Sequence, residues 1–212
     1  MYNISYFKEK DKQVLLQFLH DQPFAFLTGS DSNNEQVATQ IPLLVEERDG
    51  ELYLQGHMMR NTDHHKAFTQ NPKVLAVFTG PHCYVSASWY SAPGIASTWN
   101  YMSVQIKGEI TFMNDNELHP FMRKMTLRFE DKNQASPAIY DNLPDEFLNS
   151  MLPAITGFEI RADEINNVFK LSQNRDEQSY QNIIEHLHEK GGNSSLIASE
   201  MEKRKEELFP PK

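Results

Sequence analysis

The segment from residue 24 to residue 57 constrains the fold most, because it predicts strands that follow one another through short turns. It reads FAFLTGSDSNNEQVATQIPLLVEERDGELYLQGH, and its apolar runs are separated by GSDSNN and ERDG. Both separators have compositions that favour hairpin turns. We therefore expect three strands here, and strands joined by connections this short pair antiparallel.

The rest of the chain places helices between such runs of strands. Apolar residues at helical spacing predict helices at 11–22, 63–70, 115–130 and 144–155, and two charged helices follow Asp176. Strands are expected at 73–80, at 104–112 and, as two strands around a short turn, within 156–174. This order predicts an α+β fold with a mostly antiparallel sheet of about six or seven strands that closes into a barrel.

The composition is that of one ordinary globular domain. The chain has 212 residues, of which 39% are hydrophobic and 23% are charged. Its net charge of −9 disfavours a broad DNA-binding surface. The single cysteine precludes an internal disulfide and fits a reducing compartment. Neither the charged N-terminus nor any apolar run resembles a signal peptide or a membrane span, so we expect a cytoplasmic protein without a membrane segment.

Several motif classes are absent from the sequence. The nine glycines form neither G-x-G-x-x-G nor a Walker loop, which argues against a Rossmann or P-loop nucleotide site. There is no G-x-S-x-G nucleophile motif and no C-x-x-C pair. The pair His64 and His65 lacks a third ligand at metal spacing, so no metal site is expected.

A polar cluster, GHMMRNTDHHK at residues 56–66, follows a predicted strand and precedes a helix that Thr62 could cap. Phosphates are typically bound by the fork of an arginine, the charge of a lysine and hydroxyl groups, to which a helix N-terminus can add. We interpret the cluster as a candidate phosphate clamp, and the open alternative is an exposed polar connection. The candidate ligands are His57, Arg60, Thr62 and Lys66, of which Arg60 is the leading one, with His64 and His65 beside them.

An aromatic cluster, GPHCYVSASWYSAPGIASTWNY at residues 80–101, contains both tryptophans of the chain. His82, Tyr84 and Ser86 alternate along a predicted strand, so they share one face, which we expect to line a ligand crevice. Cys83 falls on the opposite face and is expected to be a small buried apolar residue. The alternative is a dimer core without a ligand. The aromatic residues expected at the rim and in dimer contacts are Trp89, Tyr90, Trp99 and Tyr101.

These motifs and KLSQN at residues 170–174 closely resemble, in order and spacing, the PaiB family of FMN-binding negative transcriptional regulators. The resemblance runs from residue 1 to about residue 190. It implies a split β-barrel of the kind found in pyridoxamine-phosphate oxidases, with FMN held at the interface of a homodimer. It also implies a split-barrel domain over 1–190, followed by a helical tail over 191–212.

The family pattern can be transferred residue by residue. Gly56, His57 and Arg60 keep the pattern Gly-His, two residues, Arg, whereas residues 61–63 read Asn-Thr-Asp in place of Ala-Asn-Pro. The carboxylate of Asp63 is unfavourable beside a phosphate. The family's proline before TWNY is Ser97 here, and Trp99 of that motif is among the residues expected to contact the cofactor.

The KLSQN motif is expected to contribute to the same cofactor site. In a strand, Lys170 and Ser172 point to one side, while Leu171 and Gln173 point to the other. With Leu171 facing the core, we predict that Lys170 and Ser172 bond the flavin ring or its ribityl chain across the dimer interface. Gln173 would steady the turn and is counted with the cofactor residues. The alternative is an edge strand whose lysine discourages aggregation.

Two classes of function follow. The first is an FMN-binding regulatory protein, for which DNA contact rests on the resemblance alone, because no helix-turn-helix is visible. The second is a flavin-dependent oxidoreductase acting on a small molecule. No catalytic residue is assigned, although His57, His64 and His82 could each supply a proton. Haem binding lacks an axial-ligand motif, and whether FMN stays bound through purification is left open.

Overall fold

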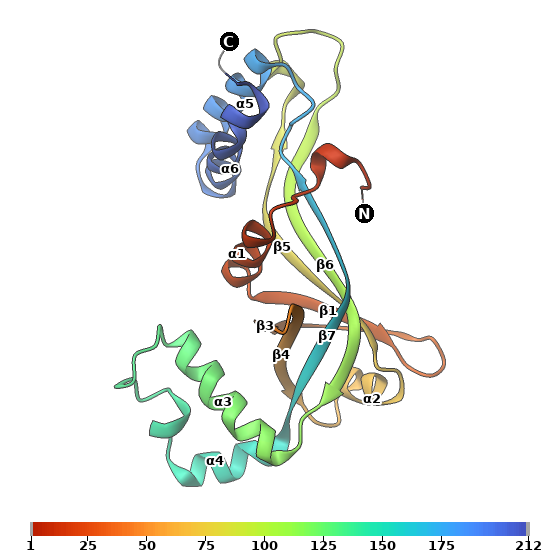
Figure 1. The fold of residues 1–212 in the computed structure, drawn as a ribbon, viewed down its shortest axis with the longest axis vertical. Coiled ribbons are helices and arrows are strands. Elements are labelled where there is room, and N and C mark those ends of the chain that lie inside the picture. Colours follow the sequence, from red (N-terminus) through yellow and green to blue (C-terminus); the bar gives the residue numbers. More distant parts are fainter. Residues whose placement is uncertain (1, 211–212) are drawn as a thin grey trace. The chain divides into compact units, whose positions relative to one another are not determined.

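The computed structural model describes residues 2–210, which form an α+β fold (Figure 1). Seven strands make one sheet in the order β2-β1-β5-β6-β7-β4-β3, and the β1–β2, β1–β5, β3–β4 and β4–β7 ladders are antiparallel. The predicted fold class is confirmed. The strands are β1 (Phe24–Ser30), β2 (Gln36–Pro42), β3 (Leu44–Arg48), β4 (Glu51–Met59), β5 (Lys73–Val85), β6 (Thr98–Phe112) and β7 (Ile155–Lys170). The α-helices are α1 (Lys12–Asp21), α2 (Asp63–Gln70), α3 (Asp115–Phe129), α4 (Asp145–Met151), α5 (Glu177–Lys190) and α6 (Gly192–Leu208).

The segment from β1 to β4 holds four strands, so the prediction of three is wrong. β2 ends at Pro42, which has no N–H to donate to a ladder. Leu43 is buried and donates its N–H to the Pro23 carbonyl at 2.8 Å, outside both neighbouring strands. The break was not predicted because residues 41–45, IPLLV, form a continuous apolar run that is typical of a single strand.

The segment from residue 155 to residue 170 is one strand, so the prediction of two strands around a turn is also wrong. The polar run RADEINN suggested a turn, but β7 continues through it, and four of its side chains, Arg161, Asp163, Glu164 and Ile165, are exposed. Within this run, Glu164 forms an ion pair with Lys107 of β6 at 2.8 Å. A polar stretch of a strand therefore had the composition of a loop and was wrongly predicted as a turn.

The chain divides into two compact units that share its long strands. Unit 1 comprises Met1–Phe18, Thr79–Val104 and Asn166–Lys212, and unit 2 comprises Leu19–Phe78 and Gln105–Ile165. The polar cluster at 56–66 therefore belongs to unit 2, whereas the aromatic cluster at 80–101 and KLSQN belong to unit 1. In unit 2 the backbone of β4 lies close against the Phe158 ring at the first residue of the polar cluster, since a Cβ on Gly56 would come within 2.6 Å of that ring.

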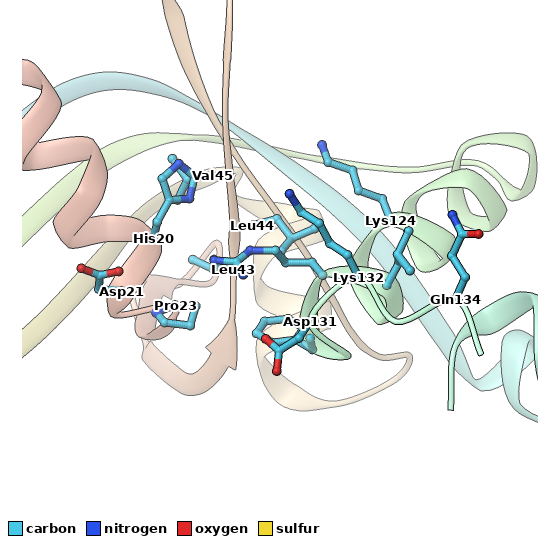
Figure 2. A pocket seen from close by; sticks show the side chains of 13 residues that line it. His20, Asp21, Pro23, Leu43, Leu44, Val45, Lys124, Asp131, Lys132 and Gln134 are labelled. Carbon is cyan, nitrogen blue, oxygen red and sulfur yellow. The ribbon is translucent and has the colours of Figure 1, made fainter. Parts of the chain in front are cut away.

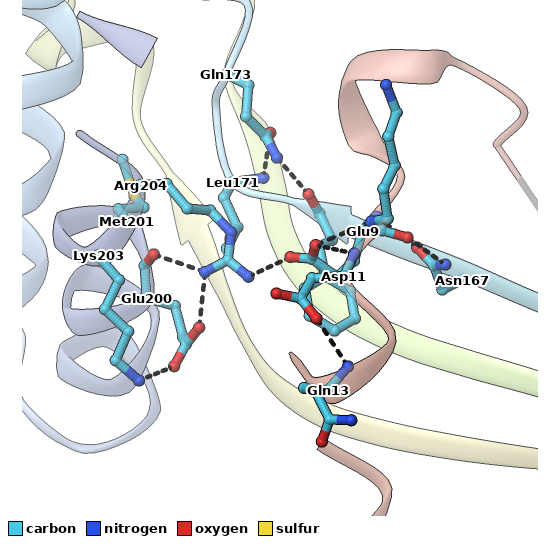
Figure 3. A network of polar contacts seen from close by, with 12 residues as sticks. Glu9, Asp11, Gln13, Asn167, Leu171, Gln173, Glu200, Met201, Lys203 and Arg204 are labelled. Carbon is cyan, nitrogen blue, oxygen red and sulfur yellow. Dashed lines mark hydrogen bonds and ion pairs between the residues drawn. The ribbon is translucent and has the colours of Figure 1, made fainter. Parts of the chain in front are cut away.

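α6 lies in the segment 191–212 that was predicted as a C-terminal tail, and it packs within unit 1, while residues 211 and 212 lie outside the described residues. Ile197, Ala198 and Met201 of α6 are buried, and the Tyr180 hydroxyl of α5 donates to the Met201 carbonyl at 2.9 Å. Arg204 lies between Glu200 and Glu9, and its guanidinium reaches both carboxylates, at 2.7 and 2.9 Å (Figure 3). α6 is thus held by apolar packing within unit 1 and by an ionic contact to Glu9 of the N-terminal segment.

Candidate functional site

The polar cluster of unit 2 occupies the connection from β4 to α2. Asn61 adopts a left-handed backbone with φ 65°, and Thr62 is the N-cap of α2. The Thr62 hydroxyl accepts the His65 N–H at 3.3 Å and donates to the Met59 carbonyl at 3.0 Å. The capping predicted for Thr62 is confirmed, and its hydroxyl is already engaged in holding the helix start.

Arg60 is held along its stem but not at its tip. Its backbone N–H donates to the Ala154 carbonyl at 2.8 Å, and its Nε donates to the Ile155 carbonyl at 2.8 Å. Within residues 2–210, its two terminal nitrogens make no hydrogen bond or ion pair. Lys66 lies in the first turns of α2, is exposed, and likewise has no side-chain partner among the described residues. Two cations therefore keep their donors available.

The histidines of this cluster are mostly engaged locally. His64 donates to Asp63 from its backbone at 2.7 Å and contacts the same carboxylate with Nδ1 at 2.9 Å, and these bonds lower the pKa of Asp63. His65 Nδ1 accepts the Asn61 N–H at 3.1 Å, and burial, followed by the charge of Arg60, lowers the pKa of His65.

His57 on β4 has a different environment. Its Nδ1 is buried and has no hydrogen-bond partner within residues 2–210, and burial lowers the pKa of this ring. A buried, unpartnered nitrogen is uncommon in folded proteins, which makes His57 Nδ1 a candidate contact for a ligand.

The aromatic cluster of unit 1 presents three rings to solvent. His82 and Tyr84 alternate on β5 and are exposed, and Trp99 on β6 is 55% exposed. The Trp99 ring lies 6.2 Å from His82 and 6.1 Å from Tyr84, centroid to centroid. Cys83 points to the opposite face and is buried, as predicted, and burial raises the pKa of its thiol to about 11.

Other members of the aromatic cluster pack inside the chain. Trp89 stacks on His186 of α5 with 5.0 Å between ring centroids. Tyr90 is buried within the chain, so the prediction that it contributes to the rim and to dimer contacts is wrong. Ser86 lies just beyond β5, where its hydroxyl accepts the Ser88 N–H at 3.3 Å and caps a short 3-10 helix.

The KLSQN segment bonds mainly to its own unit. β7 ends at Lys170, and Ser172 has a left-handed backbone with φ 63° and is buried, so the predicted outward direction of Ser172 is wrong. Its hydroxyl exchanges hydrogen bonds with the Asn100 amide at 3.0 and 3.1 Å. Gln173 closes the turn by accepting the Leu171 N–H at 2.8 Å and donating to the Phe169 carbonyl at 2.6 Å.

Lys170 and Arg175 are the cations of this segment. Lys170 Nζ donates to the Thr98 hydroxyl and to the Trp99 carbonyl at 2.8 Å, and burial, followed by the charge of Arg175, lowers the pKa of Lys170. Arg175 lies over the Tyr90 ring at 4.5 Å, and within residues 2–210 its buried Nε has no partner. Sequence reasoning missed Arg175, although its place directly after KLSQN was the available signal.

The predicted site residues thus fall into two groups. Unit 2 holds His57, Arg60, Thr62 and Lys66, while unit 1 holds His82, Tyr84, Ser86, Trp99, Lys170, Ser172 and Gln173. In the described part of the chain, no cluster of three or more His, Cys, Asp or Glu side chains is suited to a metal ion. The same residues contain no helix long and apolar enough to cross a membrane.

Comparisons with known proteins agree with this architecture. A family model described as "Putative FMN-binding domain" matches residues 1–164. The Bacillus subtilis (strain 168) "Protease synthase and sporulation protein PAI 2" is 33% identical over 203 residues, which cover 95% of this chain and 97% of the relative.

Two solved structures share the fold at low sequence identity. The flavocytochrome Anf3 from Azotobacter vinelandii has a TM-score of 0.57 at 15% identity, with 80% of this chain and 72% of that chain covered. The FAD and heme binding protein from Mycobacterium smegmatis has a TM-score of 0.54 at 17% identity, with 76% and 72% covered. The predicted split-barrel fold and the family resemblance are confirmed, and the family match supports the predicted FMN cofactor.

Proposed function

Because the chain belongs to this FMN-binding family and resembles the PAI 2 protein along nearly its whole length, we propose that it is a PaiB-like protein that holds the phosphate of FMN with Arg60 and Lys66. The observation that carries the proposal is the pair of cations with unused donors. Arg60 offers two terminal nitrogens in a planar fork, which suits a phosphate. His57 Nδ1 is a third unpartnered polar group in the same unit.

The chemistry of the donor set fits FMN. The charge of Asp63 would oppose a phosphate, but this carboxylate is bonded by the His64 backbone and ring. Thr62 acts as a positioning residue because its hydroxyl fixes the start of α2, on which Lys66 lies. When bound, FMN supplies electron-transfer chemistry, while the protein supplies binding, orientation and electrostatics.

The group in unit 1 is a separate proposal for contacts to a flat ring. Trp99 and Tyr84 expose large ring faces, which suit a planar heterocycle. Lys170 already donates to the Thr98 hydroxyl and to the Trp99 carbonyl, so in this proposal it holds the backbone beside the Trp99 ring and does not bond the flavin. Ser172 and Gln173 act by holding the turn that follows Lys170.

A homodimer is supported by an apolar face of the sheet in unit 2. Phe24 and Phe26 of β1 are 59% and 43% exposed, and Val77 of β5 is the ladder partner of Phe26. Directly paired residues share one face of a sheet, so these side chains form one apolar strip, in which the two phenylalanines are exposed and Val77 is half-buried. We propose that this strip contacts a second copy of the chain. Phe26→Glu should then give a monomer by light scattering, whereas Tyr53→Glu on β4 should not.

The regulatory role is proposed from the resemblance to the PaiB family, with the flavin-dependent oxidoreductase as the second candidate. The net charge of −9 argues against a broad DNA-binding face. We propose that regulation depends on the bound flavin and takes place in the cytoplasm, where a free thiol such as Cys83 is stable. Transcript profiles of a deletion strain and an Arg60→Ala strain should then coincide.

The phosphate clamp is tested by titrating FMN into full-length, flavin-free protein and following flavin fluorescence. Arg60→Ala should weaken binding about ten- to a hundred-fold, because a charge-assisted hydrogen bond contributes roughly 1.5–3 kcal/mol. Arg60→Lys should recover only part of the loss, since lysine has no fork. Lys73→Ala removes another exposed cation of unit 2 and should change nothing. If Arg60→Ala binds FMN like the parent, the clamp is elsewhere, and a parent that binds no FMN would refute the cofactor itself.

A further inference from the structure

A pocket of about 600 Å³ lies within unit 2, and none of the residues of the phosphate clamp lines it. Its walls come from the end of α1, the break between β2 and β3, and the end of α3 with the segment that follows (Figure 2). A volume of this size is typical of sites for small molecules. Nothing in the FMN proposal requires this cavity.

The walls of the pocket are largely apolar. Leu43 and Leu44 are buried at its base, while Val45 and Leu127 are half-buried. Phe129, the last residue of α3, also lines the pocket and is 44% exposed, which is unusual for so large an apolar side chain. These walls suit a ligand with an apolar body.

The charges around the pocket favour a negative head group. Lys124 is paired with Glu46 at 2.9 Å, but the side chains of Arg128 and Lys132 make no hydrogen bond or ion pair within residues 2–210. Asp131 is the carboxylate beside them, and Asp21 lines the pocket with an interaction of its own. Figure 2 shows Lys132 and Leu44 near the centre of the view, with His20 and Asp21 on one side and Lys124 on the other.

We propose that this pocket binds a small organic anion with an apolar body, of the class of medium-chain carboxylates. The carboxylate head lies between Arg128 and Lys132, and the arginine fork accounts for a preference for a planar anion. The chain of the ligand packs against Leu43, Val45 and Phe129. This is a second site, independent of the flavin.

Calorimetric titration of octanoate and octanol into the full-length protein, with and without saturating FMN, tests the proposal. Octanoate should bind more tightly than octanol. Arg128→Gln should weaken octanoate about ten-fold or more and leave octanol unchanged, because only the head group loses a charged partner. Lys132→Gln should act in the same direction with a smaller effect.

Two further variants separate a local effect from a general one. Arg123→Gln removes a cation from α3 that pairs with Asp141 and does not line the pocket, and it should leave octanoate binding unchanged. Val45→Trp fills the pocket and should abolish binding of both probes while FMN affinity persists. Equal affinity for octanoate and octanol, no effect of Arg128→Gln, or no octanoate binding to the parent would each overturn the proposal.

Discussion

The phosphate clamp and the KLSQN segment carry similar side chains, but their hydrogen bonds are arranged in opposite ways. In the clamp, the stem of Arg60 is fixed by backbone carbonyls, while its terminal nitrogens and Lys66 have no partner within residues 2–210. In KLSQN, Ser172 and Gln173 bond to neighbouring groups of unit 1. A polar motif can bind a ligand only with the donors that its own fold leaves unused.

The comparison predicts that KLSQN acts first on stability, and Ser172→Val should show the largest effect. A β-branched residue is strained at φ 63°, and the buried Asn100 amide would lose its partner. Together these changes should lower the free energy of unfolding by about 3 kcal/mol, measured in urea. Ser172→Gly removes only the hydrogen bonds and should cost less. A loss below about 1 kcal/mol for Ser172→Val would contradict a structural role.

The second prediction concerns the ionic contacts that tie α6 to the N-terminal segment beside KLSQN. Arg204 pairs with Glu9 and Glu200, lies over the Phe169 ring at 5.5 Å, and is mostly buried (Figure 3). Arg204→Met should therefore lower the free energy of unfolding by about 2 kcal/mol, because two carboxylates lose their partner.

Lys203→Met is the matched control for this second prediction. Lys203 pairs with Glu200 at the surface, where an ion pair contributes only about 0–1 kcal/mol. If the two variants unfold alike, the Arg204 contacts are no stronger than ordinary surface pairs. Neither variant should alter FMN affinity, since both act on the scaffold of unit 1.

The third prediction contrasts Lys170 directly with Arg60. Lys170→Met removes two hydrogen bonds inside unit 1, so we expect a loss of about 1 kcal/mol in stability and a change in FMN affinity of less than about three-fold. Arg60→Ala should show the reverse weighting: FMN binding weakens about ten- to a hundred-fold, while the flavin-free protein loses about 1 kcal/mol at most, because one hydrogen bond from Nε to the Ile155 carbonyl is removed. A large affinity loss for Lys170→Met with unchanged stability would make Lys170 a ligand residue and break the contrast.

The sequence predicted the elements of this molecule better than the direction of its polar side chains. The α+β class, the helices and the capping by Thr62 follow from local spacing and from turn chemistry. The sequence did not predict the break at Leu43, because the burial of Leu43 depends on residues far away in the chain. It did not predict the continuity of β7 either, because the solvent exposure of that strand also depends on distant residues.

The candidate site shows the same limit at single residues. Alternation placed Cys83 correctly inside, because β5 continues past it to Val85. It failed for Ser172, because the strand ends two residues earlier and the backbone turns left-handed. Which donors are already used, as with Thr62 and Lys170, depends on partners that the sequence pattern does not reveal.

The smallest expected effect concerns His57, the buried ring of the clamp region with an unpartnered Nδ1. Burial lowers its pKa, so the unfolded chain takes up a proton near pH 6.5 more readily than the folded one. Stability should therefore fall as the pH is lowered through this range, and His57→Phe should remove part of that fall. We expect the difference in the free energy of unfolding between the parent and His57→Phe to change by less than about 1 kcal/mol between pH 8 and pH 6.

The same pH dependence, measured with FMN bound, tests whether His57 lies close to the phosphate in the clamp. A phosphate close to His57 favours the protonated ring and raises its pKa toward or above the ordinary value. In the FMN-saturated protein, the fall in stability with decreasing pH should then shrink for the parent and stay unchanged for His57→Phe, as measured by urea unfolding at each pH. If saturating FMN does not change the pH dependence of the parent's stability, His57 lies away from the phosphate. In that case only Arg60 and Lys66 of the clamp bind the phosphate.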